Sequence, residues 1–336
     1  MFSGGGKTSA GLDIGSQVIK LVSVQRQGAK AVIKAFAQEP TPSKLVDGGI
    51  VTDPMAIGQV VRNLVERCNL KGAKVISAVA GQQVYTRLLT LPSMPMDELR
   101  HAALYQSSSF LPLSIDEVAV DVFPVRDFED EEGKKLEVFF VAARKVQVEN
   151  LQQACQIGGL KLTRVEIEPL ALFQLYRQQI TSEPVVAVLN IGAQRTYLAV
   201  FRQGILVFLR SIAFGCSAFF LQIQQYLGQA GSLESIDLND PAYQNLLADL
   251  LGEVGRSLDY YQLQHKDDNV GRIIICGGGS RIPRVEGYLS NSLNRPVLIG
   301  GLGEEIERPA ELGENEQRAL FHDFPVAVGL ALRGVF

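Results

Sequence analysis

The spacing of apolar residues predicts a chain in which strands and helices alternate. Within residues 54–68, Ile57, Val61 and Leu64 recur at helical spacing, which predicts an amphipathic helix. Residues 272–276 read Arg-Ile-Ile-Ile-Cys, which is typical of a buried strand. Further helices are expected at 96–110, 145–157, 168–180, 217–227, 241–266, 283–293 and 325–332. Further strands are expected at 74–79, 85–91, 118–126, 135–143 and 162–167, with clusters of strands at 11–37 and 185–214.

One short unit of this pattern occurs twice. Residues 12–17 read Leu-Asp-Ile-Gly-Ser-Gln, and residues 189–194 read Leu-Asn-Ile-Gly-Ala-Gln. Each copy is followed by a β-type run and then by Arg-Gln-Gly. Such a repeat suggests two similar domains that face each other. A glycine turn between paired strands exposes backbone N–H groups, so two such turns could hold a polyphosphate from opposite sides.

Composition narrows the class of protein. The 336 residues are 46% hydrophobic with a net charge of −4, which allows two domains with cores and does not favour a nucleic-acid surface. The four cysteines stand at no metal or redox spacing, so we expect buried thiols in a reducing compartment. No apolar run reaches the ~20 residues of a bilayer span, and no signal peptide opens the chain. We therefore expect a cytoplasmic protein.

Three glycine turns follow predicted strands, at Gly15, at Gly192 and at 277–279. In their order along the chain and in their residues, they resemble the motifs of the actin-like ATPase superfamily, which includes actin, DnaK-type chaperones, sugar kinases and FtsA. Residues 11–16 and 188–193 resemble its two phosphate motifs, and 274–283 resemble its adenosine motif. Residues 168–171 and 327–331 resemble its two connecting helices, so that the resemblance covers residues 10–336.

Within the superfamily, the chain resembles the PilM family of type IV pilus assembly. Residues 12–16 followed by 18–22, and the stretch from 104–106 through 110–113 to Asp121, match that family. The resemblance implies an α/β, actin-like (ribonuclease H-like) two-domain fold with an inserted small α+β subdomain, as in FtsA. It places the first domain at 11–83, 161–184 and 320–336, the insert at 84–160 and the second domain at 185–319. The glycine-rich start, residues 1–10, is expected to be disordered.

The same resemblance implies partners. PilM proteins are cytoplasmic and bind the short N-terminal peptide of PilN, an inner-membrane protein. Pilus motor ATPases and other copies of the chain remain open as further partners. FtsA usually continues into a membrane-binding helix, and nothing follows Phe336 here. Any link to the membrane is therefore expected to pass through a partner.

The expected ligand is ATP with Mg²⁺. Predicted contacts to the phosphates come from the two turns and are Gly15, Ser16, Gln17, Gly192, Ala193 and Gln194. Predicted contacts to the adenosine are Gly277, Gly278, Gly279 and Arg281. Lys20 either points inward and adds charge or points outward into solvent. By resemblance to the chaperones, Glu253 and Arg256 reach the ribose, or they form a surface ion pair. Asp13 would hold Mg²⁺ through water.

Hydrolysis is expected to be slow or absent. A water must be oriented or deprotonated, and the second phosphate motif of the superfamily supplies a carboxylate for this. Here that position is Asn190, which cannot act as a base. Glu168 either orients the water or is a plain carboxylate at a helix N-terminus. The expected role is a nucleotide-bound scaffold; the alternatives are an FtsA-like polymerising cell-division protein and a small-molecule kinase of the same fold.

Overall fold

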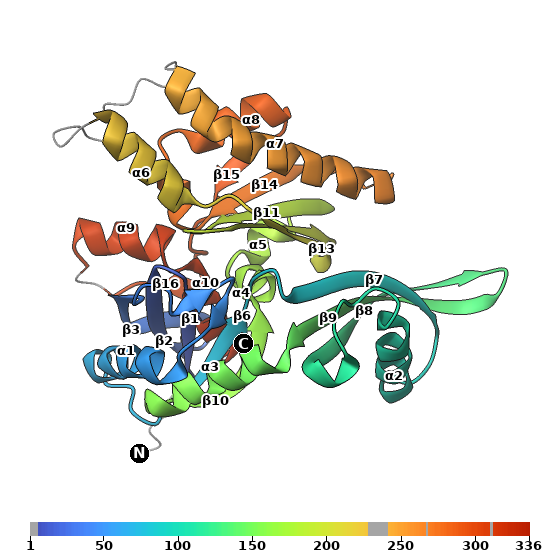
Figure 1. Cartoon of the computed structure of the whole chain (residues 1–336), viewed down its shortest axis with the longest axis horizontal. Coiled ribbons are helices and arrows are strands. Elements are labelled where there is room, and N and C mark those ends of the chain that lie inside the picture. The colour runs from blue at the N-terminus through green and yellow to red at the C-terminus, as the bar shows by residue number, and fades with distance from the viewer. Residues whose placement is uncertain (1–5, 228–240, 267, 310–311) are drawn as a thin grey trace.

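A computed structural model describes residues 6–227, 241–266, 268–309 and 312–336. Figure 1 shows two lobes, one above the other, with a smaller sheet projecting from one side. The sheet of the first lobe has the strand order β10-β6-β1-β2-β3-β16. Its strands are β1 (Thr8–Ile14), β2 (Val18–Gln27), β3 (Lys30–Pro40), β6 (Lys74–Val79), β10 (Lys161–Ile167) and β16 (Ile306–Glu307).

The start of β1 corrects one prediction. Residues 8–10 belong to this strand, although the segment 1–10 was expected to be disordered. The apolar pattern begins only at Leu12, but the register pairs Thr8 with Gln25 across the β1–β2 hairpin. The pairing is therefore imposed by the neighbouring strand. Residues 1–5 lie outside the described part of the chain.

The second lobe repeats the strand arrangement of the first. Its sheet has the order β13-β12-β11-β14-β15. In each lobe the first two strands form an antiparallel hairpin, and a later strand pairs in parallel with the first. The repeated sequence unit thus forms the same strand–turn–strand in both lobes. The strands are β11 (Val185–Ile191), β12 (Thr196–Arg202), β13 (Ile205–Ile212), β14 (Arg272–Cys276) and β15 (Val297–Ile299).

The projecting part is a three-stranded sheet with the order β7-β9-β8. It comprises β7 (Val84–Pro92), β8 (Val118–Asp130) and β9 (Gly133–Arg144), with α2 (Met96–Ser107) and the short helix η1 (Ile115–Glu117). Its apolar side chains form a core of their own, which includes Leu99, Val138 and Phe140. Strands β8 and β9 continue through most of the acidic segment 127–132, so only a tight turn remains at the tip.

Two segments depart from the predicted domain division. Helix α3 (Lys145–Ile157) was assigned to the insert, but it packs against α1 (Pro54–Arg67) in the first lobe. Gly58 of α1 allows this, because a Cβ there would lie 2.6 Å from the Ile157 side chain. Strand β16 was assigned to the second domain, but it pairs with β3 of the first sheet. In both cases tertiary packing overrides proximity along the chain.

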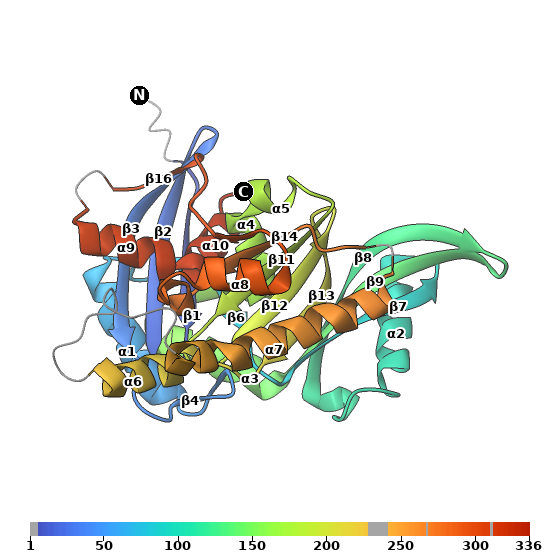
Figure 2. The same ribbon diagram turned by 90° about the horizontal axis from the view of Figure 1, so that it is seen from above.

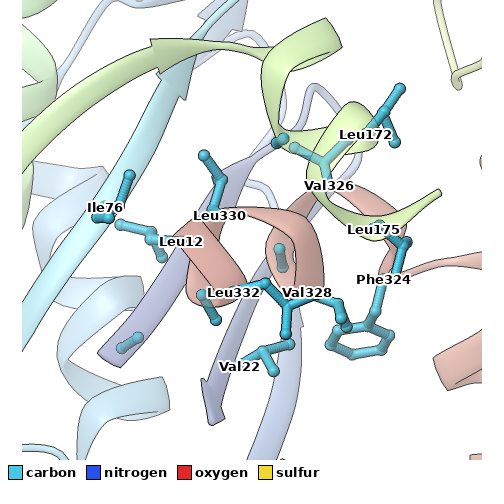
Figure 3. Close-up of a cluster of buried hydrophobic side chains, with 14 of the residues drawn as sticks. Leu12, Val22, Ile76, Leu172, Leu175, Phe324, Val326, Val328, Leu330 and Leu332 are labelled. Atoms are coloured by element: carbon cyan, nitrogen blue, oxygen red, sulfur yellow. The ribbon is translucent and has the colours of Figure 1, made fainter. Parts of the chain in front are cut away.

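Two buried helices lie between the lobes. Helices α4 (Glu168–Leu175) and α10 (Pro325–Arg333) cross closely, and Figure 3 shows their apolar side chains meeting those of the first sheet. Residues 325–332 are buried throughout, as expected for a helix that is apolar all round. Gly329 permits the crossing, because a Cβ there would lie 2.0 Å from the Ala171 carbonyl oxygen.

Three helices cover the outer face of the second lobe, as the two views of Figures 1 and 2 show. They are α6 (Cys216–Leu227), α7 (Pro241–Gln264) and α8 (Val285–Leu293). The other helices are α5 (Arg177–Ile180), which contacts α4 and β11, η3 (Gly278–Arg281), which packs on β11, and α9 (Glu314–His322), which contacts η3 and α10. A short hairpin joins β4 (Val46–Asp47) to β5 (Ile50–Val51). Within the described residues, no helix is long and apolar enough to cross a membrane.

Candidate functional site

The predicted site residues meet in a cleft of about 360 Å³ between the lobes. Such a volume lies in the range of small-molecule sites in proteins. All but three of the predicted residues line the cleft. Those that do are Asp13, Gly15, Ser16, Gln17, Lys20, Glu168, Asn190, Gly192, Ala193, Gln194, Gly277, Gly278 and Arg281. The exceptions are Gly279, Glu253 and Arg256.

The two repeated turns have the same internal geometry. The Gly15 amide donates to the Val18 carbonyl oxygen at 3.2 Å, and the Gly192 amide donates to that of Arg195 at 2.9 Å. A Cβ on either glycine would lie 2.8 Å from the carbonyl oxygen that it contacts. The glycine amides, which we predicted as phosphate donors, are thus used inside their own turns.

The next amides in each turn remain for a ligand. Within the described chain, the backbone N–H groups of Ser16, Gln17, Ala193 and Gln194 make no hydrogen bond. All four residues line the cleft, two from each lobe, and unpaired backbone donors gathered in this way can bind an anion. The arrangement supports phosphate binding by four amides.

Lys20 points into the cleft, which decides between its two predicted orientations. It stands directly opposite Asp13 in the β1–β2 ladder, and its Nζ lies 3.1 Å from Asp13 Oδ2. Only 18% of the Lys20 side chain is exposed. Burial opposes the ammonium charge, but the carboxylates around it, Asp13 first and then Asp323 and Glu168, together outweigh burial and raise the pKa of Lys20. A buried positive charge is therefore available to phosphate.

Glu168 and Asn190 meet where α4 begins and β11 ends. The Asn190 amide Nδ2 donates to Glu168 Oε2 at 3.1 Å. Burial, and then the Asp13 carboxylate, raise the pKa of Glu168 to about 8, while Asn190 and Lys20 act in the opposite direction. In the ligand-free chain the protonated form of Glu168 is therefore favoured at neutral pH. Neither side chain can then accept a proton from water.

The third glycine turn approaches Asn190 closely. Gly277 has a φ of +80°, which glycine adopts at little cost, and a Cβ there would lie 2.4 Å from Asn190 Oδ1. Gly279 has another role, because its Cβ would lie 2.1 Å from Cγ2 of Ile191. It serves the packing of η3 on β11. Only Gly277 and Gly278 of the turn line the cleft.

Arg281 has a partner that sequence reasoning missed. Its guanidinium forms an ion pair with Asp323, which also lines the cleft. Burial raises the pKa of Asp323, while Arg281 and Lys20 lower it. The one available signal was an acidic residue shortly before Pro325, near the start of a predicted helix.

Glu253 and Arg256 lie on α7 and pair with each other at 2.5 Å. The Arg256 side chain is 64% exposed, and that of Glu253 is 36% exposed. This arrangement matches the surface ion pair, which was the alternative to ribose contact. A spacing of three residues on a helix favours such a pair whatever lies nearby.

The cleft has the donors that a magnesium ion held through water would need. The described residues contain no cluster of three or more His, Cys, Asp or Glu side chains around one point. However, the charge of Asp13 disfavours ionised Glu168, so a cation beside them would relieve the repulsion between two carboxylates. Mg²⁺ keeps several waters and uses one or two carboxylates. Asp13 and Glu168 therefore fit the ion.

Comparisons with known proteins agree with this architecture. Residues 11–335 match the family model described as type IV pilus assembly protein PilM. A solved structure titled "PilM-PilN type IV pilus biogenesis complex" is 27% identical, with a TM-score of 0.84 over 98% of both chains.

Two more distant structures share the fold. EutJ from Carboxydothermus hydrogenoformans is 14% identical with a TM-score of 0.51, covering 97% of this chain and 89% of that one. ADP-bound MreB5 of Spiroplasma citri is 14% identical with a TM-score of 0.50, covering 88% and 92%. The predicted actin-like α/β fold is confirmed by these neighbours. Because the match to the family model covers residues 11–335 of the 336, the chain belongs to the PilM family of type IV pilus assembly proteins.

Proposed function

We propose that the chain is an ATP-binding scaffold of the type IV pilus inner-membrane assembly platform. It binds the cytoplasmic N-terminal peptide of PilN and couples that protein to the pilus motor. The observation that carries the proposal is the similarity over 98% of both chains to a structure titled as a PilM–PilN complex. The chain would then be cytoplasmic and held at the membrane by its partners. Neither the cell-division nor the kinase alternative is favoured by the comparisons.

The cleft supports the nucleotide part of the proposal. The free amides of the two turns would contact the phosphates, and the Lys20 ammonium would balance their charge. Gly277, Gly278 and Arg281 line the part of the cleft assigned to adenosine. Asp13 and Glu168 would hold Mg²⁺, which neutralises phosphate charge when bound.

The nucleotide acts mainly as a clasp between the lobes. Asn190 is neutral and cannot act as a base, and Asp13 and Glu168 are the carboxylates assigned to Mg²⁺, so the site offers no further carboxylate to activate a water. Binding from both sides favours one arrangement of the lobes over others. The crossing of α4 and α10 at Gly329 joins the lobes beside the cleft, so a change of arrangement would be transmitted there.

Fluorescence anisotropy with a labelled N-terminal peptide of PilN from the same organism tests the scaffold role. We expect saturable binding to the full chain in the micromolar range, about −8 kcal/mol, and no binding of a scrambled peptide. The titration is run without nucleotide, with Mg-ADP and with Mg-ATP. If the folded chain binds the peptide in none of these states, the proposed role is wrong.

A further inference from the structure

A second hollow, separate from the cleft, lies between β7 of the projecting sheet and β13 of the second lobe. It has a volume of about 1040 Å³, and α7 contributes Tyr260 and Gln264 to its wall. Figure 1 shows β13 above the start of β7, and the two strands are in contact there. None of its lining residues lines the nucleotide cleft. We call this hollow the β7–β13 groove.

The groove is flanked by two sheet edges. β7 is the outer strand of the three-stranded sheet, and β13 is the outer strand of the five-stranded sheet. In the described chain no ladder joins these two strands. An edge strand presents backbone N–H and C=O groups that can pair with an added strand. A groove between two such edges is therefore suited to an extended peptide.

The charge of the groove is positive and unbalanced. Arg87 and Arg210 line it, and neither forms an ion pair within the described residues. No Asp or Glu is among its lining residues. Guanidinium groups pair with carboxylates through two parallel hydrogen bonds, which gives strength and direction. The missing partner of this surface is thus a carboxylate.

The aromatic side chains hold the two arginines in place. The Arg87 guanidinium carbon lies 4.6 Å from the centre of the Phe110 ring, and that of Arg210 lies 6.0 Å from the Tyr260 ring. Contacts of this kind orient a guanidinium over a ring face.

We propose that the β7–β13 groove binds an extended peptide segment that carries carboxylate side chains. The segment adds to an exposed strand edge, and its acidic side chains pair with Arg87 and Arg210. This goes beyond the proposed function, which concerns the nucleotide and the PilN peptide. The occupant is identified by its chemistry: extended backbone, alternating side chains and negative charge.

The groove is also connected to the nucleotide cleft. Arg195, which lines the cleft, donates to Ser211 Oγ at 3.4 Å. When the Gln82 amide oxygen is turned toward Arg195, it accepts hydrogen bonds from both terminal guanidinium nitrogens of Arg195, at 3.0 and 2.6 Å. Gln82 and Ser211 both line the groove. A phosphate that attracts Arg195 would therefore alter the wall of the groove.

The test uses a fluorescein-labelled peptide in which valine and threonine alternate with glutamate, added to the full chain without nucleotide. We expect it to bind about tenfold more tightly than the same peptide with lysine in place of glutamate. Arg87→Glu and Arg210→Glu should each weaken binding by about tenfold. Lys34→Glu is the matched control, because this exposed lysine lies on β3 outside the groove and should leave affinity unchanged. Methylating alternate peptide nitrogens should also weaken binding, since it removes backbone donors.

Several results would overturn the proposal. One is that the glutamate peptide does not bind at concentrations up to about 1 mM. Another is that the glutamate and lysine peptides bind with equal affinity. A third is that both arginine variants bind the glutamate peptide as tightly as the native chain does. Tighter binding of oligothymidine at the same residues would assign the groove to nucleic acid instead. Because the nucleotide is absent from these titrations, they remain decisive if the chain proves unable to bind ATP. Circular dichroism of each variant excludes loss of fold as the cause.

Discussion

Replacing Glu168 by glutamine should change how stability depends on pH. The unfolded chain loses the Glu168 proton near pH 4.5, whereas the folded chain retains it to about pH 8. Between these values the folded state binds more protons than the unfolded state, so the stability of the native chain falls as pH rises. Glutamine resembles the protonated acid and does not titrate. The variant should therefore lose less stability over this range.

The size of this difference in unfolding free energy follows from the two causes that raise the pKa of Glu168, burial and the Asp13 carboxylate. Without screening, a change from 4.5 to about 8 corresponds to about 5 kcal/mol. Glu168 lines an open cleft that water enters, so we expect about 2 kcal/mol at pH 9 and almost no difference at pH 4.5. Asp13 contributes part of the effect through its charge, so bound Mg²⁺ should reduce it.

Urea unfolding followed by circular dichroism at several pH values between 4.5 and 9 measures this difference. Glu66→Gln is the matched control, because Glu66 is exposed on α1 and lies outside the cleft. The free energy of unfolding of the control should depend on pH in the same way as that of the native chain. The free energy of unfolding of Glu168→Gln should exceed that of the native chain by an amount that grows as pH increases. Parallel curves for all three proteins would show that Glu168 ionises normally and would refute the argument from burial.

Three further substitutions test other parts of the account. Lys20→Met should weaken Mg-ATP binding about tenfold in calorimetry, because it removes the buried ammonium, whereas Lys34→Met should have no effect. Gly329→Ala should destabilise the chain by about 3 kcal/mol in thermal unfolding, because its Cβ would lie 2.0 Å from a carbonyl oxygen of α4. Gly287→Ala, where a Cβ contacts nothing within 4 Å, should be neutral or stabilising; equal losses would contradict the packing argument. Asn190→Asp should raise phosphate release from ATP if Mg²⁺ and Glu168 are already placed, and an unchanged rate would mean that further catalytic groups are missing.

The parts of the site that form locally could be predicted from the sequence. Each repeated turn is a short hairpin whose geometry depends on a glycine and its neighbours, so Gly15 and Gly192 were found from one chain alone. The sequence left the orientation of Lys20 open, because it did not give the register that sets Lys20 opposite Asp13 in the hairpin. The use of the glycine amides inside the turns was missed, since it depends on backbone direction rather than residue type.

Features that depend on long-range packing could not be predicted. Asp323 meets Arg281 only because the end of the chain returns to the cleft. Helix α3 follows the insert in sequence, yet its apolar face packs on α1 in the first lobe. The position of Glu253 and Arg256 was undecided for a related reason. Their spacing defines one face of a helix but not what that face meets.

Calorimetric titration of Mg-ATP and Mg-ADP into the full chain tests the central claim most directly. The claim is that backbone amides of two related turns, with Lys20 between them, hold a nucleotide in the cleft between the lobes. The account predicts one site per chain with an affinity in the micromolar range, about −8 kcal/mol, weakened by Lys20→Met. No binding of either nucleotide to well-folded chain would contradict it.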